Sequence, residues 1–248
     1  MAALQIRQDG DLLHVILARP ERRNAFDAEL IAELTEAFEG VPEDVRAVIL
    51  SGEGQSFSAG ADVEWMRSSI DLSYEENVAD ARRLRKMLET IDTCPAPVLT
   101  RVHGHALGGG CGLVACSDVV VSAPHTVFAF SEVKLGIIPA VISPFALAKI
   151  GPSAARRYFV TGEPFDAQTA LRIGLVHEVA DDLDVAVDRI VTHLRSAGPE
   201  AARHAKKLVL ERPDGLGTER RIAQRRTSEE GQEGLRAFLE KRPPTWSG

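Results

Sequence analysis

Hydrophobic and polar positions alternate along residues 3–18, on both sides of Asp9-Gly10-Asp11. A period of two with a turn signal at its centre is typical of a β-hairpin. The pattern then changes to helical spacing over residues 27–39, where Asp27 is the expected N-cap. A short apolar run from Val45 to Leu50 predicts a buried strand that ends at a glycine-rich turn.

The middle of the chain continues this alternation of helices and strands. A polar stretch, Ser68 to Ser73, predicts a mobile loop before a helix over Tyr74–Thr90. The pattern next predicts a strand over Val98–Val102, a short helix over Gly109–Cys116 and a strand over Val119–Ser122. We therefore expect an α/β fold of ββα or βαβ units around one core.

From Asp182 onward the chain reads as almost wholly helical, with breaks at Gly198-Pro199, at Pro213 to Gly217 and at Gly231. This change predicts two parts, a core over 1–181 and a helical region over 182–248. A helical end that cannot bury its own apolar face commonly packs on another subunit, so we expect a homo-oligomer.

Composition narrows the function classes. The formal net charge of -7 over 248 residues argues against a nucleic-acid binder. No apolar run approaches the roughly 20 residues that span a bilayer, and the N-terminus carries no signal-like segment. Cys94, Cys111 and Cys116 match no metal or disulfide spacing and read as buried thiols. A cytoplasmic protein without a membrane partner, metal or separate cofactor is expected.

A late group of basic residues allows two interpretations, a solvated helix face or a site for an acidic ligand. Its members are Lys206, Lys207, Arg220, Arg221, Arg225, Arg226, Lys241 and Arg242.

Two glycine-containing segments are candidates for binding negative charge. In Ser56 to Asp62, Gly60 permits a turn that exposes the following N–H groups, although a plain strand-to-helix turn explains the segment equally simply. In His103 to Leu113, Gly108-Gly109-Gly110 opens a helix whose free N–H groups suit a phosphate or an oxyanion. With no obvious partner nearby, His103 and His105 read as strand-end residues.

The third segment is Phe128 to Pro139, in which Glu132 is surrounded by apolar residues. Desolvation favours a raised pKa and general acid–base work, whereas an ion pair with Lys134 or an exposed position at a strand end is the simpler alternative. Two backbone donors and one shielded carboxylate together are what enolisation of a thioester requires.

These segments, in their order and spacing, resemble the crotonase superfamily, also called the enoyl-CoA hydratase/isomerase family. The resemblance runs from Arg19-Pro20-Glu21-Arg22-Arg23-Asn24-Ala25, through the segments above, to Glu230–Pro243. It implies a crotonase-like spiral of ββα units with a C-terminal trimerisation region, assembled as a trimer or as a hexamer of two trimers. The part near Ser131–Pro144 is similar to a bacterial enoyl-CoA or methylglutaconyl-CoA hydratase-like subgroup.

The resemblance also implies site residues for an acyl-CoA substrate. Ala61 and Gly109 would supply the oxyanion N–H groups, and Glu132 would be the acid–base residue. Contacts to substrate or coenzyme A would come from Arg22, Arg23, Ala59, Gly60, Asp62, Gly108, Gly112, Pro139, Phe238 and Lys241, with Phe238 and Lys241 reaching a neighbouring subunit's site.

Two departures bear on the reaction. Two-glutamate hydratases of the family have a glutamate at the position of Gly112, and Pro139 to Pro144 stands where many members have a glycine-rich turn. The expected activity is therefore of hydratase/isomerase type on a short or branched unsaturated acyl-CoA, with Δ3,Δ2-enoyl-CoA isomerisation as the alternative to hydration. A non-catalytic acyl-CoA-binding protein and an RNA-binding protein are the rival classes.

Overall fold

The computed structural model describes residues 3–247. Its larger sheet has six strands in the order β1-β2-β3-β4-β6-β9, which are Leu4–Asp9, Leu12–Leu17, Ala47–Gly52, Val98–Val102, Val119–Ser122 and Glu178–Val179. Strands β1 and β2 form the expected antiparallel hairpin, and every other pair in this sheet is parallel. A smaller sheet orders β5 (His105–Leu107), β7 (Val127–Ala129) and β8 (Phe165–Asp166).

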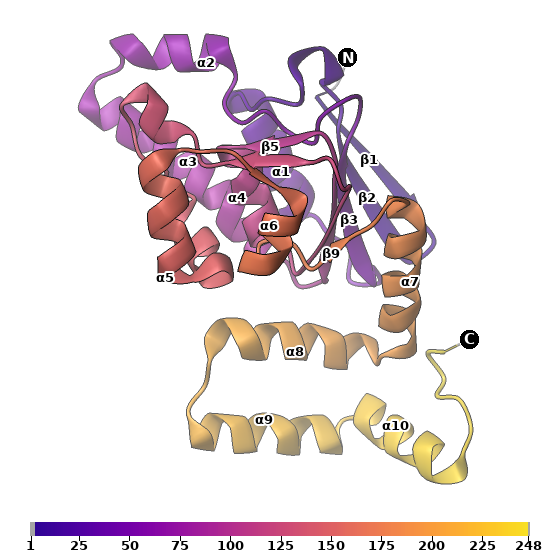
Figure 1. Cartoon of the computed structure of the whole chain (residues 1–248). Helices are drawn as coiled ribbons and strands as arrows, with labels where there is room; N and C mark the ends of the chain where they lie inside the picture. The colour runs from indigo at the N-terminus through magenta and orange to yellow at the C-terminus, as the bar shows by residue number, and fades with distance from the viewer. Residues whose placement is uncertain (1–2, 248) are drawn as a thin grey trace.

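Helices surround the sheets (Figure 1). The core helices are α1 (Ala28–Glu39), α2 (Val63–Ser68), α3 (Tyr74–Asp92), α4 (Gly109–Cys116), α5 (Ser143–Thr161) and α6 (Ala167–Ile173). Four more follow: α7 (Leu183–Ser196), α8 (Pro199–Glu211), α9 (Gly215–Thr227) and α10 (Glu229–Glu240). Single 3-10 turns cover Pro20–Arg22, Ser69–Asp71 and Glu132–Leu135.

Successive side chains of β3 point to opposite faces of the large sheet, and each face is covered by helices. Val48 and Leu50 belong to the main core, which includes residues of α1, α3 and α4. Ala47 and Ile49 point to the other face, where they pack with Val187 and other residues of α7. A parallel sheet buried on both faces needs such continuous apolar strands.

The division at residue 182 coincides with the start of α7, whose packing on the sheet ties it to the core. In Figure 1, α8, α9 and α10 project below the core as a separate layer. The two-part description stays a prediction, and the projecting part begins at α8.

Several predicted elements are confirmed with small shifts. Asp27 caps α1 by accepting a hydrogen bond from Leu30 N at 2.9 Å. The predicted strand over 45–50 lies at Ala47–Gly52, because Val45 N bonds Pro42 O in a turn. Helix α3 runs two residues beyond Thr90, to Asp92.

The segment Ser68–Ser73 leads into a helix at Tyr74 as predicted and its mobility stays a prediction, whereas the predicted break at Gly231 was wrong. Residues 69–71 form a 3-10 turn, and Ser73 begins α3 with a reciprocal capping box to Glu76. Gly231 does not break the chain but lies within α10. The break is at Ser228, whose hydroxyl accepts a hydrogen bond from Gly231 N.

The three cysteines are free and buried, as predicted. Five of the late basic residues, Lys206, Lys207, Arg221, Arg225 and Arg242, form ion pairs with carboxylates. Among residues 3–247, no helix is long and apolar enough to cross a membrane, and no group of His, Cys, Asp and Glu side chains is arranged to hold a metal ion.

Candidate active site

Two turns meet at the centre of the site. The first follows β3, and the second joins β5 to α4. In the first, Ser58 forms a parallel bridge to Ala106 of β5. Gly60 has φ of +86°, and a Cβ there would lie 2.6 Å from Leu107 O and 3.6 Å from Gly109 N. Only glycine allows this approach, so Gly60 brings the backbone before Ala61 against the start of α4.

Several backbone donors beside these turns already have acceptors. Asp62 N bonds Phe26 O at 2.7 Å, and Gly108 N bonds Ala129 O at 2.8 Å. In the described part of the chain, the backbone hydrogen bonds outside helices and strands include none donated by Ala61 or Gly109. Gly109 is also the first residue of α4, where the helix leaves its N–H without an internal acceptor. The two N–H groups can therefore donate hydrogen bonds to a ligand oxygen.

Glu132 begins the 3-10 turn Glu132–Leu135, directly after β7 and Phe130-Ser131. Its Oε2 is buried without a hydrogen-bond partner among residues 3–247. A Cβ at Gly108 would lie 3.3 Å from its Oε1, so the carboxylate contacts the entrance of α4. Burial raises the pKa of Glu132 above the ordinary value, although its own backbone N–H opposes the shift.

The alternative ion pair between Glu132 and Lys134 is absent from the described residues. Lys134 instead extends along Gly162, where its Cε would lie 3.3 Å from an added Cβ. Glu132 is therefore left as a shielded carboxylate facing open space.

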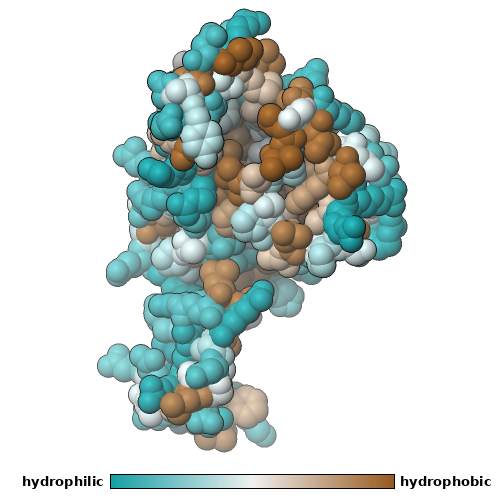
Figure 2. Space-filling view, turned by 90° about the vertical axis from the view of Figure 1, so that its left-hand side faces the viewer, coloured by the Kyte–Doolittle hydropathy of each residue, from teal (hydrophilic) through white to brown (hydrophobic). Residues whose placement is uncertain are grey.

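That open space is a cavity of about 440 Å³. Its lining includes the candidate residues Ala59, Gly60, Ala61, Gly108, Gly109, Glu132 and Pro139. Most other lining side chains are apolar, among them Trp65, Met66, Leu84 and Val141. On the face over α2, α3 and α5, Figure 2 shows a hollow bordered by hydrophobic residues. A partly apolar cavity with a few convergent polar groups is typical of a small-molecule site.

Gly112 does not line this cavity. It is buried one turn inside α4, and a Cβ there would lie 2.7 Å from Ile142 Cγ2 and 3.5 Å from Leu88 Cδ2. Ile142 belongs to the segment Pro139–Ile142, which forms one wall of the cavity. The space for a side chain at position 112 is thus occupied by Ile142.

Asp62 and Arg22 contact each other. Arg22 Nη1 lies 3.0 Å from Asp62 Oδ2, and Arg19 Nη2 lies 3.4 Å from the same oxygen. Asp62 also caps α2 by accepting a hydrogen bond from Glu64 N. Burial alone would raise the pKa of Asp62, but Arg22 and the backbone N–H groups lower it below the ordinary value. The carboxylate of Asp62 therefore holds the turn and does not face the cavity.

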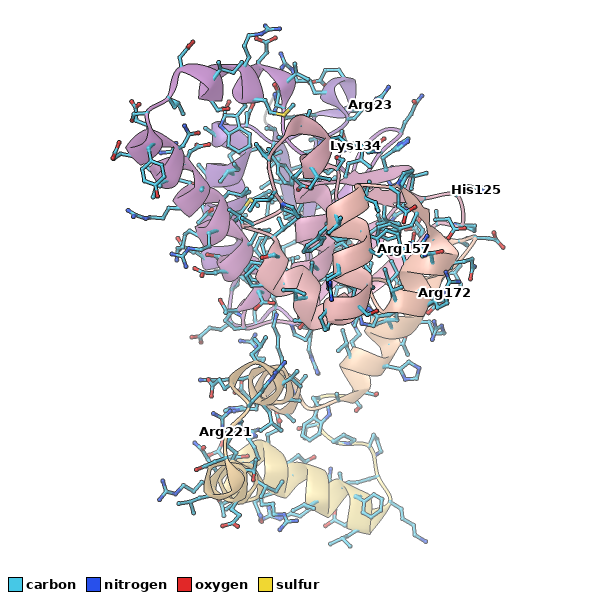
Figure 3. The ribbon with its side chains drawn as sticks, turned by 60° about the vertical axis from the view of Figure 1, so that its left-hand side comes forward. Arg23, His125, Lys134, Arg157, Arg172 and Arg221 are labelled. Carbon is cyan, nitrogen blue, oxygen red and sulfur yellow. The ribbon has the colours of Figure 1, made fainter. Side chains whose placement is uncertain are left out.

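Arg23 is exposed and has φ of +51°. Figure 3 shows it on the surface of the upper part of the molecule, far from Arg221 in the helical layer. Within the described chain it forms no ion pair, which leaves its guanidinium available to an anionic ligand.

Phe238 and Lys241 are not brought to this cavity. They lie in α10 and at its C-cap, in the layer below the core, whereas α2 and α3 lie at the top of Figure 1. Phe238 is 81% exposed. A role for these two residues at an active site requires a neighbouring subunit and stays a prediction.

His103 and His105 lie at strand ends, as predicted, and each has a hydrogen-bond partner. His103 Nε2 lies 2.9 Å from Gly54 O, and His105 Nδ1 lies 3.2 Å from Ser56 Oγ. Neither lines the cavity, so both connect the strand ends to the 54–56 turn.

The sequence interpretation missed the contribution of α3 beyond Asn77. Asn77, Asp80, Ala81 and Leu84 line the cavity at helical spacing. This spacing was visible in the sequence, but nothing there indicated that this face of α3 turns toward Glu132.

The chain is similar to known proteins along nearly its whole length. The model of the enoyl-CoA hydratase/isomerase family matches residues 7–248. A crystal structure of an enoyl-CoA hydratase from Shewanella pealeana is 40% identical, with a TM-score of 0.94 over 98% of this chain and 96% of that one. Pseudomonas aeruginosa AtuE is 33% identical, with a TM-score of 0.96 over 99% of this chain and 100% of that one.

A curated relative is also similar along most of its length. The mitochondrial enoyl-CoA hydratase domain-containing protein 3 of Rattus norvegicus is 31% identical over 97% of this chain and 83% of its own. The fold, the match of the family model and these identities together show that the chain belongs to the enoyl-CoA hydratase/isomerase family.

Proposed function

We propose that this acyl-CoA enzyme moves the double bond of a 3-enoyl-CoA to the 2-position, with Glu132 as its single acid–base residue. The observation that carries the proposal is the unpartnered, buried Oε2 of Glu132 in a cavity where Ile142 fills the space beside Gly112. Hydration by two carboxylates needs a second one at that position, whereas a proton shuttle between two carbons needs only one.

The proposed reaction begins with the thioester oxygen at the N–H groups of Ala61 and Gly109. Ionised Glu132 takes a proton from C2, which lies between the carbonyl and the C3–C4 double bond. The C–H electron pair becomes part of a dienolate, whose oxygen charge the two N–H donors stabilise. Glu132 then returns the proton to C4, and the double bond closes between C2 and C3.

The raised pKa of Glu132 supports this assignment, because a carboxylate with greater proton affinity is a better base toward carbon. The apolar cavity supports it as well, because exclusion of water strengthens the interaction of the dienolate with the N–H donors. Arg23 would contact the phosphates of the substrate's coenzyme A, because Arg22 already forms an ion pair with Asp62.

Hydration is the second candidate, and it is favoured by the names of relatives that are called enoyl-CoA hydratases. Incubation with 2-enoyl-CoA and 3-enoyl-CoA esters in heavy water, followed by mass spectrometry, separates the two. We expect the 3-enoyl ester to become the 2-enoyl ester with deuterium incorporation. A product that has gained a whole water would establish a hydratase, and no change in either ester would contradict both.

A further inference from the structure

The face of α3 that lines the cavity changes character along the helix. Asn77 and Asp80 are polar and Leu84 is apolar, and Leu88, one turn further on and outside the lining, packs beside Gly112. Eight residues of helix separate Asp80 from Leu88, about 12 Å along the axis. Asp80 therefore cannot take the place of a carboxylate at position 112, and it meets a different part of the ligand.

The charged side chains that line the cavity are all acidic. They are Glu132 and Asp80, and no Lys, Arg or His in the described chain is among the lining residues. The side chain of Asp80 is only 14% exposed, so water screens its charge poorly. Its cationic partner is Arg83, 2.7 Å away, whose own side chain is 58% exposed and lies outside the lining.

We propose that Asp80 is a specificity residue that confines the enzyme to uncharged acyl chains and excludes chains that end in a carboxylate. This inference rests on the proposed function, since it concerns the acyl group of the same thioester. With the thioester oxygen at Ala61 and Gly109, the acyl chain extends into the space between α3 and Pro139–Ile142. A carboxylate there loses water and meets the like charge of Asp80, and no cation in the described lining compensates for it.

A matched pair of esters tests the proposal, 3-methylcrotonyl-CoA and 3-methylglutaconyl-CoA, which differ by one terminal carboxylate. The measured quantity is the ratio of kcat/KM for deuterium incorporation from heavy water. We expect the wild type to prefer the uncharged ester. Asp80→Asn should shift the ratio toward the carboxylated ester by about tenfold, because it removes the repulsion and releases Arg83.

Two further variants distinguish an effect of charge on the ratio from an effect of altered folding. Glu75→Gln removes a carboxylate from the exposed side of α3, outside the cavity, and should leave the ratio unchanged. Arg83→Gln removes the partner of Asp80 and should strengthen the preference for the uncharged ester. A ratio that stays the same in Asp80→Asn would overturn the inference.

The outcomes distinguish this inference from the proposed function. If the wild type exchanges deuterium but Asp80→Asn keeps its ratio, the inference alone fails. If neither ester exchanges, the proposed function fails, and calorimetric binding of the two esters then decides the inference without chemistry. A roughly tenfold shift in relative affinity between the wild type and Asp80→Asn supports it, and equal affinities overturn it.

Discussion

Ile142 fills the space that a side chain at Gly112 would need. A Cβ built on Gly112 would lie 2.7 Å from Ile142 Cγ2, closer than such atoms approach in folded proteins. The glycine and the isoleucine therefore depend on each other, because a larger residue at position 112 requires a smaller one at 142. The absence of a carboxylate at this position is thus built into the packing of the cavity wall.

Gly112→Glu is expected to destabilise the protein by about 1–3 kcal/mol, the usual cost of overpacking a core. Ile142→Ala alone should cost about 2–5 kcal/mol, since it leaves a cavity. The double variant should be more stable than the sum of the two changes, because the glutamate enters the space that Ile142 leaves. Thermal unfolding of the three variants measures this coupling. Strict additivity of their costs would show that the two side chains do not compete for space.

Asp62→Asn tests the ion pair that holds the first turn. The ionised carboxylate accepts hydrogen bonds from Arg22 and from Glu64 N, and its pKa is lowered in the folded state. A lowered pKa contributes stability above the unfolded pKa of aspartate, and this stability is lost as the pH falls through the folded value. The variant should lose about 1–3 kcal/mol at pH 7 and less in acid.

Asp166→Asn provides the matched control for this comparison. Asp166 also caps a helix, by accepting a hydrogen bond from Thr169 N at 2.8 Å, but it is exposed and has no ion-pair partner in the described chain. Its loss should cost less than that of Asp62. Urea unfolding at pH 7 and pH 4 measures both, and an equal loss at both pH values for Asp62→Asn would contradict the role of its charge.

Gly60→Ala should impair catalysis more than folding. The added methyl meets Leu107 O at 2.6 Å and pushes the Ala61 and Gly109 N–H groups apart. Loss of one oxyanion donor lowers kcat by about 10²-fold or more. Gly10→Ala is the control, because Gly10 also has positive φ, +57°, but has open space around it. If the two variants have the same kcat, the close approach at Gly60 has no catalytic role.

Phe238→Ser tests the predicted assembly. Phe238 and Leu239 of α10 are 81% and 77% exposed, which is costly for large apolar side chains in a lone chain. We expect the variant to form smaller assemblies than the wild type in light scattering and to bind coenzyme A esters more weakly. Val185→Ser, on the outer side of α7, is the control. An unchanged mass for Phe238→Ser would exclude this patch from the interface.

Much of the fold follows from sequence patterns, because the apolar periods are strong and local. The hairpin around Gly10, the cap at Asp27 and the strand over Val98–Val102 are each determined by neighbouring residues. A prediction was wrong where a neighbouring cap outweighed the helix-breaking tendency of a glycine. Gly231 breaks no helix, because Ser228 already caps α10 and α10 tolerates the glycine.

The candidate site could be predicted only in part. The turns at Gly60 and Gly108 carry sequence signals because positive φ strongly favours glycine. Asp80 and Leu84 were missed, because their place at the cavity depends on how α3 packs on α4. Such contacts join residues far apart in the chain, and no local pattern encodes them.

The central claim is that Glu132 alone moves the proton, and Glu132→Gln tests it most directly. The measurement is the rate of deuterium incorporation into a 3-enoyl-CoA in heavy water as a function of pH. In the wild type this rate should rise with pH through a pKa above the ordinary glutamate value of 4.5, because the base must be ionised. Glu64→Gln, an exposed carboxylate outside the cavity lining, is the control and should behave like the wild type.

For Glu132→Gln, the account predicts a loss of about 10²-fold or more with coenzyme A ester binding retained. It also predicts the disappearance of the rising limb of the pH profile. Incorporation within a few-fold of the wild-type rate, with the same pH dependence, would contradict the assignment of Glu132.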